Sequence, residues 1–111
     1  MAKMDHPTTP DGRYFVSKGK LWRKTDPRLE DGERRAAIKA MMQARRDNGR
    51  ASTEAETQAA RARIDAAKIR LGEKGPVWWD DGAPDESGLA PERSSYAGWW
   101  AGLGDVEKAD A

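Results

Sequence analysis

A segment with two adjacent tryptophans, residues 71–85, constrains the fold of this 111-residue chain more than any other. Gly72 ends a helical pattern, Pro76 stops the helix from resuming, and Trp78-Trp79 follow at once. Neighbouring side chains of an extended segment point to opposite sides, so only one of the two rings is easily buried. We therefore predict that this segment ends a helix and closes the core.

Tryptophan supplies core area that the rest of the composition lacks. Hydrophobic residues make up 37% of the chain and charged residues 35%, which is polar for a globular protein. Each of the five tryptophans can bury roughly 150–250 Å², so a compact core needs few aliphatic side chains. The length predicts a single small domain over residues 13–103, between a flexible arm at 1–12 and a frayed tail at 104–111.

Several classes of protein are excluded by what the sequence lacks. It contains no cysteine, which removes disulfides and thiolate sites and is typical of a reducing compartment. No apolar run approaches the roughly 18–20 residues of a membrane span, and residues 1–12 do not resemble a signal peptide. We therefore expect a cytoplasmic protein that does not contact the membrane.

A β-hairpin is predicted near the N-terminus, because two β-rich segments flank a Lys18-Gly19 turn. A two-residue loop places Phe15 opposite Trp22. It also places Val16 opposite Leu21. One side then carries Tyr14, Val16, Leu21 and Arg23, and the other carries Arg13, Phe15, Ser17, Lys20, Trp22 and Lys24.

Two helices are predicted next, joined by a short connection that makes them an antiparallel pair. The first is expected from about Glu33 to Asp47, with Asn48-Gly49 as its stop. The second begins after Thr53, because Thr53 and Glu56 form a capping box, and it ends at Gly72. The expected apolar stripe of the first helix consists of Ile38, Met41 and Met42.

The second helix is apolar on two opposite sides, which predicts two neighbours. We expect the first helix on one side and the hairpin or the tryptophan segment on the other. The two sides consist of Ala60, Ile64, Ala67 and Leu71, and of Ala59, Ala62, Ala66 and Ile69.

One side of the hairpin has the residue types that single-stranded nucleic acid requires, because aromatic rings stack on bases and cations meet phosphates. The alternative is that Phe15 and Trp22 pack on helices while the lysines surround a solvated edge. Basic residues of the first helix extend the same surface or form a solvated face. The candidate nucleic-acid-binding residues are Arg13, Phe15, Lys18, Lys20, Trp22, Lys24, Arg35, Lys39 and Arg46.

Three tryptophans are candidate partner-binding residues, because exposed tryptophans are common at interfaces. The alternative for each is packing in the core. The three are Trp79, Trp99 and Trp100.

Four carboxylates follow the first tryptophan pair, in turn sequences such as Asp-Gly and Pro-Asp. Their spacing does not match a calcium loop, so no metal site is predicted. Residues 1–50 contain thirteen Lys/Arg against seven Asp/Glu, and residues 51–111 contain seven against twelve. We therefore expect these carboxylates to pair with basic residues of the first helix. The four are Asp80, Asp81, Asp85 and Glu86.

The sequence contains no recognisable catalytic constellation. Its one histidine, His6, falls in the expected flexible arm, which is a poor position for a general base. A phosphate-binding glycine loop, a nucleophile elbow and a zinc spacing are all missing. We predict a protein that is not an enzyme, with no catalytic residues, no cofactor and no small-molecule substrate.

Three segments of the chain carry motifs that occur together in a known family. They are Gly12-Arg13-Tyr14 with Gly19-Lys20-Leu21-Trp22-Arg23, then Ala44-Arg45-Arg46, and then Asp65-Ala66-Ala67-Lys68 with residues 71–85. Over residues 12–85 the chain resembles a family of small uncharacterised proteobacterial proteins with a GRLWR hairpin and an LGE-GP-WW-DG-PD segment, some of which carry the automatic label "biopolymer transporter Tol". Near the C-terminus, Tyr96-Ala97-Gly98-Trp99 resembles the family's Tyr-Ala-x-Trp ending. The resemblance implies a bacterial origin and a single fold, and it carries over no catalytic residue.

The predicted fold class is α+β: an N-terminal β-hairpin packed with an antiparallel helix pair and locked by a tryptophan-rich, irregular C-terminal segment. The predicted function is that of a small binding or adaptor protein, with a protein partner or self-association. The alternative is a nucleic-acid-binding module that uses the basic aromatic side of the hairpin and the basic first helix.

Overall fold

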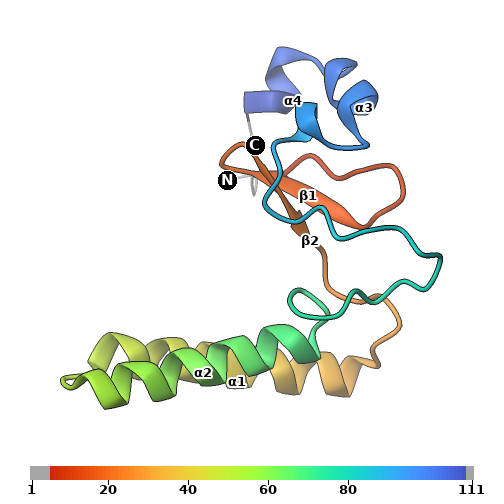
Figure 1. Ribbon diagram of the computed structural model, residues 1–111. Helices are drawn as coiled ribbons and strands as arrows, with labels where there is room; N and C mark the ends of the chain where they lie inside the picture. The colour runs from red at the N-terminus through yellow and green to blue at the C-terminus, as the bar shows by residue number, and fades with distance from the viewer. Residues whose placement is uncertain (1–5, 110–111) are drawn as a thin grey trace. The chain divides into compact units, whose positions relative to one another are not determined.

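The computed structural model describes residues 6–109 and confirms the α+β class (Figure 1). The chain forms two compact units, one with the residues up to Lys24 and from Asp81 onward, the other with Thr25–Asp80. The single domain over residues 13–103 stays a prediction, and each unit is described by itself. The elements are β1 (Tyr14–Ser17), β2 (Lys20–Arg23), α1 (Asp31–Arg50), α2 (Glu54–Arg70), the 3-10 turn η1 (Pro91–Arg93), α3 (Ala97–Ala101) and α4 (Asp105–Ala109).

The predicted hairpin register is confirmed, with Phe15 opposite Trp22 and Val16 opposite Leu21. Lys18 and Gly19 have φ values of 53° and 75°, as a type I′ turn requires. The predicted sides are also confirmed. One side is buried, and its residues are Tyr14, Val16, Leu21 and Arg23.

Both edges of the hairpin are covered. Along β1, residues Pro7–Thr9 form backbone hydrogen bonds with the strand. In one of them, Val16 N–H donates to the Pro7 carbonyl at 2.9 Å. Along β2, Leu21 N–H donates to the Leu89 carbonyl at 2.9 Å, and Gly88 N–H donates to the Leu21 carbonyl at 2.7 Å. The segment predicted as a flexible arm over residues 1–12 is therefore hydrogen-bonded to β1 in its described part, and residues 1–5 lie outside the described residues.

Helix α1 is longer than predicted, because it begins at Asp31 and continues through Asn48-Gly49 to Arg50. An Asn-Gly pair often marks a helix end, but here only residues 51 and 52 lie between α1 and the next N-cap, Thr53. That cap is the predicted one. Thr53 Oγ1 accepts from Glu56 N–H at 3.1 Å, and Glu56 Oε1 accepts from Thr53 N–H at 3.1 Å.

The predicted end of α2 at Gly72 is confirmed, with φ of 79° at this glycine. Gly72 N–H donates to the Ile69 carbonyl and Glu73 N–H donates to the Lys68 carbonyl, each at 3.0 Å, which is the Schellman pattern. The segment before α1 is joined here as well, because Asp26 N–H donates to the Leu71 carbonyl at 2.8 Å.

Helices α1 and α2 lie side by side as an antiparallel pair (Figure 1). Their buried residues are alanines with heptad spacing: Ala37 and Ala44 from α1, Ala60 and Ala67 from α2. Small side chains in these positions let two helices approach closely. The predicted apolar stripe of α1 is only partly buried, because Met42 is 51% exposed while Ile38 and Met41 are half-buried.

The second apolar side of α2 is mostly exposed, and the predicted second neighbour reaches only its C-terminal end, where Gly75 of the tryptophan segment lies close to Ile69. Ile69 is 49% exposed. Alanines present little apolar area, so leaving them in water costs little. The exposed residues are Ala59, Ala62, Ala66 and Ile69.

Trp78 and Trp79 differ in burial, as expected for neighbours in an extended segment. Trp79 is buried and Trp78 is half-buried, with ring centroids 5.2 Å apart and planes at 82°. The edge-to-face geometry is a favourable one for aromatic pairs.

The C-terminal end is helical as far as it is described, which differs from the frayed tail predicted over residues 104–111. Glu107 Oε2 accepts from Gly104 N–H at 2.8 Å, which caps α4. Lys108 Nζ lies 5.3 Å from the Trp100 ring, a cation–π contact. Among the described residues, the helices are all too short or too polar to cross a bilayer.

Candidate binding surfaces

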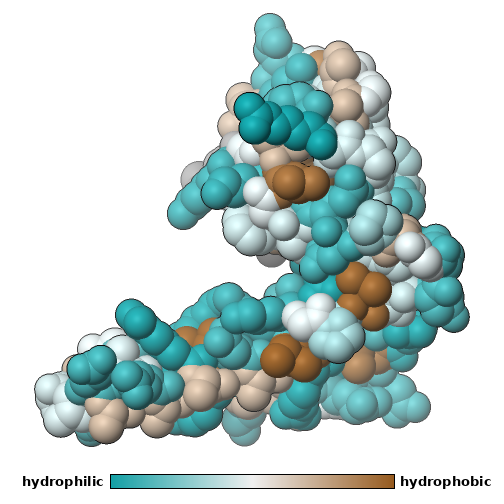
Figure 2. Space-filling view, viewed as in Figure 1, coloured by the Kyte–Doolittle hydropathy of each residue, from teal (hydrophilic) through white to brown (hydrophobic). Residues whose placement is uncertain are grey.

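Five residues form a continuous strip on α1, on the side turned away from Ala37 and Ala44, because their spacing repeats every three or four residues. They surround a shallow hollow of about 250 Å³. Its floor is apolar. On the face of the helix pair that Figure 2 shows, apolar patches alternate with hydrophilic ones. We call this surface the α1 strip, and its residues are Arg35, Ile38, Lys39, Met42 and Arg46.

The electrostatics of the α1 strip are one-sided. It contains three cations and no carboxylate. The Arg46 guanidinium donates to Gln43 Oε1 at 2.7 Å, a neutral partner that leaves its charge in place. Within residues 6–109 no carboxylate forms an ion pair with any of the three cations. The strip is therefore an apolar floor with a positive rim.

The structure divides the predicted nucleic-acid-binding residues between the two units. Arg35, Lys39 and Arg46 come together in the α1 strip. The remaining residues belong to the hairpin. Neither unit by itself therefore presents a surface that contains both groups of residues.

On the hairpin, Trp22 is 41% exposed. Its indole N–H donates to the Ser17 carbonyl at 3.1 Å, which holds the ring in place. Phe15 is only half-buried, and the ring of His6 lies 5.7 Å from it. Lys18, Lys20 and Lys24 are exposed. The nucleic-acid prediction for the hairpin stays a prediction, and Trp22 with the lysines is the part of it that faces solvent.

Arg13 has partners inside the same unit. Its guanidinium donates a short hydrogen bond to Asp81, and Asp11 lies 3.9 Å away. The pKa of Asp81 is lowered, first by the hydrogen bond from Arg13 and then by that from Ala83 N–H. Arg13 is thus a structural cation rather than an open contact for phosphate.

The candidate partner-binding tryptophans differ in exposure. Trp79 is 8% exposed, so it lies in the core and presents almost no surface. Trp99 and Trp100 are half-buried, with ring centroids 6.2 Å apart. Part of each ring is exposed to solvent, and the partner-binding prediction for both stays a prediction.

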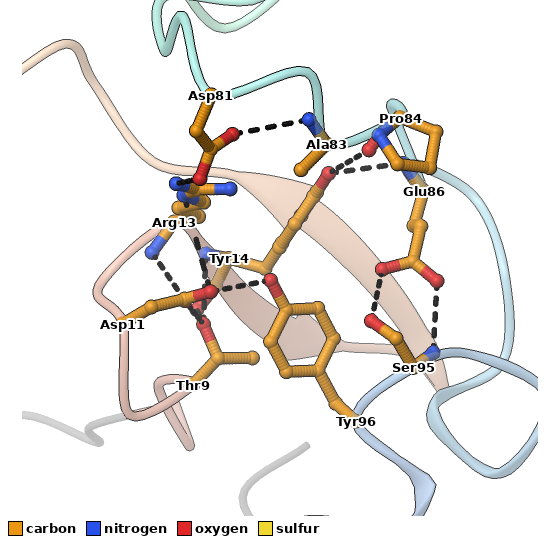
Figure 3. A network of polar contacts seen from close by, with 10 residues as sticks. All are labelled: Thr9, Asp11, Arg13, Tyr14, Asp81, Ala83, Pro84, Glu86, Ser95 and Tyr96. Carbon is orange, nitrogen blue, oxygen red and sulfur yellow. Dashed lines mark hydrogen bonds and ion pairs between the residues drawn. The ribbon is translucent and has the colours of Figure 1, made fainter.

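Two tyrosines organise a polar network that holds the C-terminal segment on the hairpin (Figure 3). The Tyr14 hydroxyl accepts from Glu86 N–H at 2.9 Å and donates to the Pro84 carbonyl at 3.4 Å. The Tyr96 hydroxyl donates to Asp11 Oδ2 at 2.6 Å. Burial and then this hydrogen bond raise the pKa of Tyr96, so the hydroxyl stays a donor.

Three of the four carboxylates after the tryptophans have partners outside the predicted first helix, and the fourth, Asp80, is exposed. Asp81 pairs with Arg13, and Asp85 lies 4.0 Å from Arg23. Glu86 accepts from the Ser95 backbone N–H at 2.8 Å (Figure 3). The charge asymmetry correctly predicted that some of these carboxylates form internal ion pairs. Their basic partners belong to the hairpin and not to the first helix, because pairing depends on which segments meet. In the described part of the chain, no group of three or more His, Cys, Asp or Glu side chains is placed to hold a metal ion.

Sequence reasoning missed Met42 as an exposed residue, because it grouped Met42 with Ile38 and Met41 in one apolar stripe. The heptad spacing of Ala37 and Ala44, matched by alanines seven residues apart in α2, was the signal for the true interface.

The chain matches no known protein-family model, and neither the curated proteins nor the solved structures yielded a match.

Proposed function

We propose that this protein is a non-enzymatic binding protein whose α1 strip receives an acidic amphipathic helix from a protein partner. The observation that carries the proposal is the exposed apolar floor of the strip, where Met42 is 51% exposed between basic side chains.

The apolar floor supports a helical partner. Ile38 and Met42 are one turn apart, which is the spacing at which an amphipathic helix places its own anchors. Methionine is unbranched and polarisable, so it adapts to the partner's side chain. Single exposed hydrophobic residues are ordinary, whereas exposed Met42 beside half-buried Ile38 in one hollow supports a docking position.

The positive rim supports an acidic partner. Arg35, Lys39 and Arg46 surround the floor without a carboxylate among the lining residues. Opposite charges on the partner's flanks steer its approach, and basic flanks would be repelled. The hollow of about 250 Å³ holds a few side chains, so the interface is small and the expected affinity is modest.

The test uses two fluorescein-labelled model peptides with the same leucine stripe, one with glutamate flanks and one with lysine flanks. Fluorescence polarisation should show saturable binding of the glutamate peptide and little binding of the lysine peptide. Met42→Glu should weaken binding on the order of tenfold or more, since it places a charge in the apolar floor.

Ile69→Glu is the matched control, because Ile69 is 49% exposed on α2 and undergoes the same change outside the strip. It should bind the glutamate peptide like the unchanged protein. Equal loss in both variants, or equal binding of the two peptides, would contradict the proposal. Circular dichroism checks that both variants keep their helices.

A further inference from the structure

A second concave surface lies between the two helices and is separate from the α1 strip. It encloses about 430 Å³ and takes residues from both α1 and α2. We call it the interhelix groove, and its lining residues are Arg45, Asn48, Arg61, Ile64, Asp65 and Lys68.

The interhelix groove contains three cations and one carboxylate. Asp65 is the one carboxylate in its lining, and its Oδ1 lies 2.9 Å from Lys74 Nζ, which offsets its charge. Across residues 6–109, no ion pair joins a carboxylate to Arg45, Arg61 or Lys68. The groove therefore carries a positive charge that an anionic ligand would satisfy.

Asn48 adds a second observation in the same place. Its Oδ1 is buried and has no hydrogen-bond partner in the described part of the chain. A buried acceptor without a donor is unfavourable, and such groups in a native fold call for an explanation. A phosphate has no proton to donate to this oxygen, so Asn48 can contribute to an anionic ligand only through its side-chain NH2 group, which donates.

The spread of the cations favours a chain of phosphates over a single one. Arg61 and Lys68 are two helical turns apart, about 10 Å along α2. Successive phosphates of one strand of duplex DNA are about 3.4 Å apart along the helix axis, so a strand presents more than one phosphate over that length. The surrounding sequence is also rich in positive charge, with ten Lys/Arg against four Asp/Glu between residues 34 and 70.

We infer that the interhelix groove binds the phosphate backbone of a nucleic acid. Arg45 and Arg61 donate to phosphate oxygens from the two helices, Lys68 contacts the next phosphates along the strand, and the Asn48 amide supplies a neutral contact. This site is distinct from the α1 strip, so the protein would bind a polypeptide on one face of α1 and a polyanion beside α2.

The experiment compares two triple variants of the full chain that remove the same charge from the same helix pair. The groove variant is Arg45→Gln, Arg61→Gln and Lys68→Gln, and the matched control is Arg35→Gln, Lys39→Gln and Arg46→Gln. Polarisation of a fluorescein-labelled single-stranded oligonucleotide is measured at two salt concentrations. Glutamine retains helix propensity, and circular dichroism checks the fold of both variants.

The groove variant should lose on the order of tenfold or more in affinity, and its salt slope should fall by about two, since each contact on a single strand contributes about 0.7. The control should bind the oligonucleotide nearly as the unchanged protein does, while losing the glutamate peptide. Trp22→Ala keeps the groove intact and tests the hairpin separately.

Three results would overturn the inference: no oligonucleotide binding at low salt, equal losses in both triple variants, or equal competition by polyglutamate of the same charge. Binding of inorganic polyphosphate without binding of the oligonucleotide would also overturn it. Because the control variant tests the α1 strip, failure of the groove and failure of the proposed function give different results.

Discussion

The hairpin and the helix–helix interface bury side chains of different size. The hairpin unit buries large side chains, Tyr14 and Leu21 among them, and its segments are joined by specific hydrogen bonds to tyrosine hydroxyls. The helix pair buries alanines and leaves Met42 and Ile69 in solvent. The helix pair itself therefore has a core of small side chains, although its unit also buries Leu71 and Trp79, and the hairpin unit in turn leaves Trp22 41% exposed.

The largest expected contrast lies between a buried and an exposed apolar residue. Leu21 is 0% exposed, so Leu21→Ala should lower the free energy of unfolding by about 2–5 kcal/mol. Met42→Ala should change it by less than about 0.5 kcal/mol, because Met42 is already in water. Urea unfolding measures both values, and equal effects would remove the contrast between the units.

Gly72 should be the most sensitive backbone position of the helix unit. A Cβ there would lie 2.9 Å from Asp26 Cβ and 3.0 Å from Trp78 Cδ1, at a φ of 79°. We expect Gly72→Ala to cost about 2–4 kcal/mol, from the left-handed backbone and the close contacts together.

Gly82→Ala separates these two contributions, because Gly82 has a φ of 83° and a Cβ there would meet nothing within 4 Å. Its cost should be about 1–2 kcal/mol, from the backbone alone. Thermal melting of the two variants should show the difference. Equal melting temperatures would mean that the contacts around Gly72 relax freely.

The alanine interface predicts intolerance to larger side chains. Ala44 is fully buried between the helices, so Ala44→Leu should destabilise the protein by about 1–3 kcal/mol. Ala62→Leu is the control, since Ala62 is exposed on α2 and should change stability little. If Ala44→Leu were neutral in urea unfolding, the close approach of the helices would be in doubt.

The smallest effect is expected from pH and belongs to the hairpin unit. The pKa of Asp81 is held below 3.8 in the folded protein, chiefly by its hydrogen bond from Arg13. The pair therefore stabilises the fold above pH 3.8, and this contribution is lost as the pH falls through the lowered pKa. The urea midpoint of Asp81→Asn should decrease less than that of the unchanged protein between pH 7 and pH 3, and parallel decreases would argue against the pair.

What the sequence predicted well depends on local chemistry. The Lys18-Gly19 turn set the hairpin register, and the Thr53 and Glu56 pair set the start of α2, because each signal acts within a few residues. The end of α1 was predicted too early, since Asn48-Gly49 expresses a preference that a short connection overrides.

The candidate surfaces depend on long-range packing, which the sequence specifies less directly. Which face of α1 is buried follows from how closely the alanines of two helices approach. The interhelix groove joins Arg45 to Arg61 and Lys68 across that interface. Neither helix shows the groove alone, so periodicity within one segment does not predict it.

The covered edges of the hairpin restrict the ways in which this protein can meet another chain. A strand added beside β1 would have to displace Pro7–Thr9, and a strand added beside β2 would have to displace Gly88-Leu89. Recruitment by strand addition is therefore disfavoured, and so is the edge-to-edge association that leads to aggregation. The backbone amides of Val16 and Leu21, which face these covering segments, should accordingly be among the slowest to exchange with deuterium.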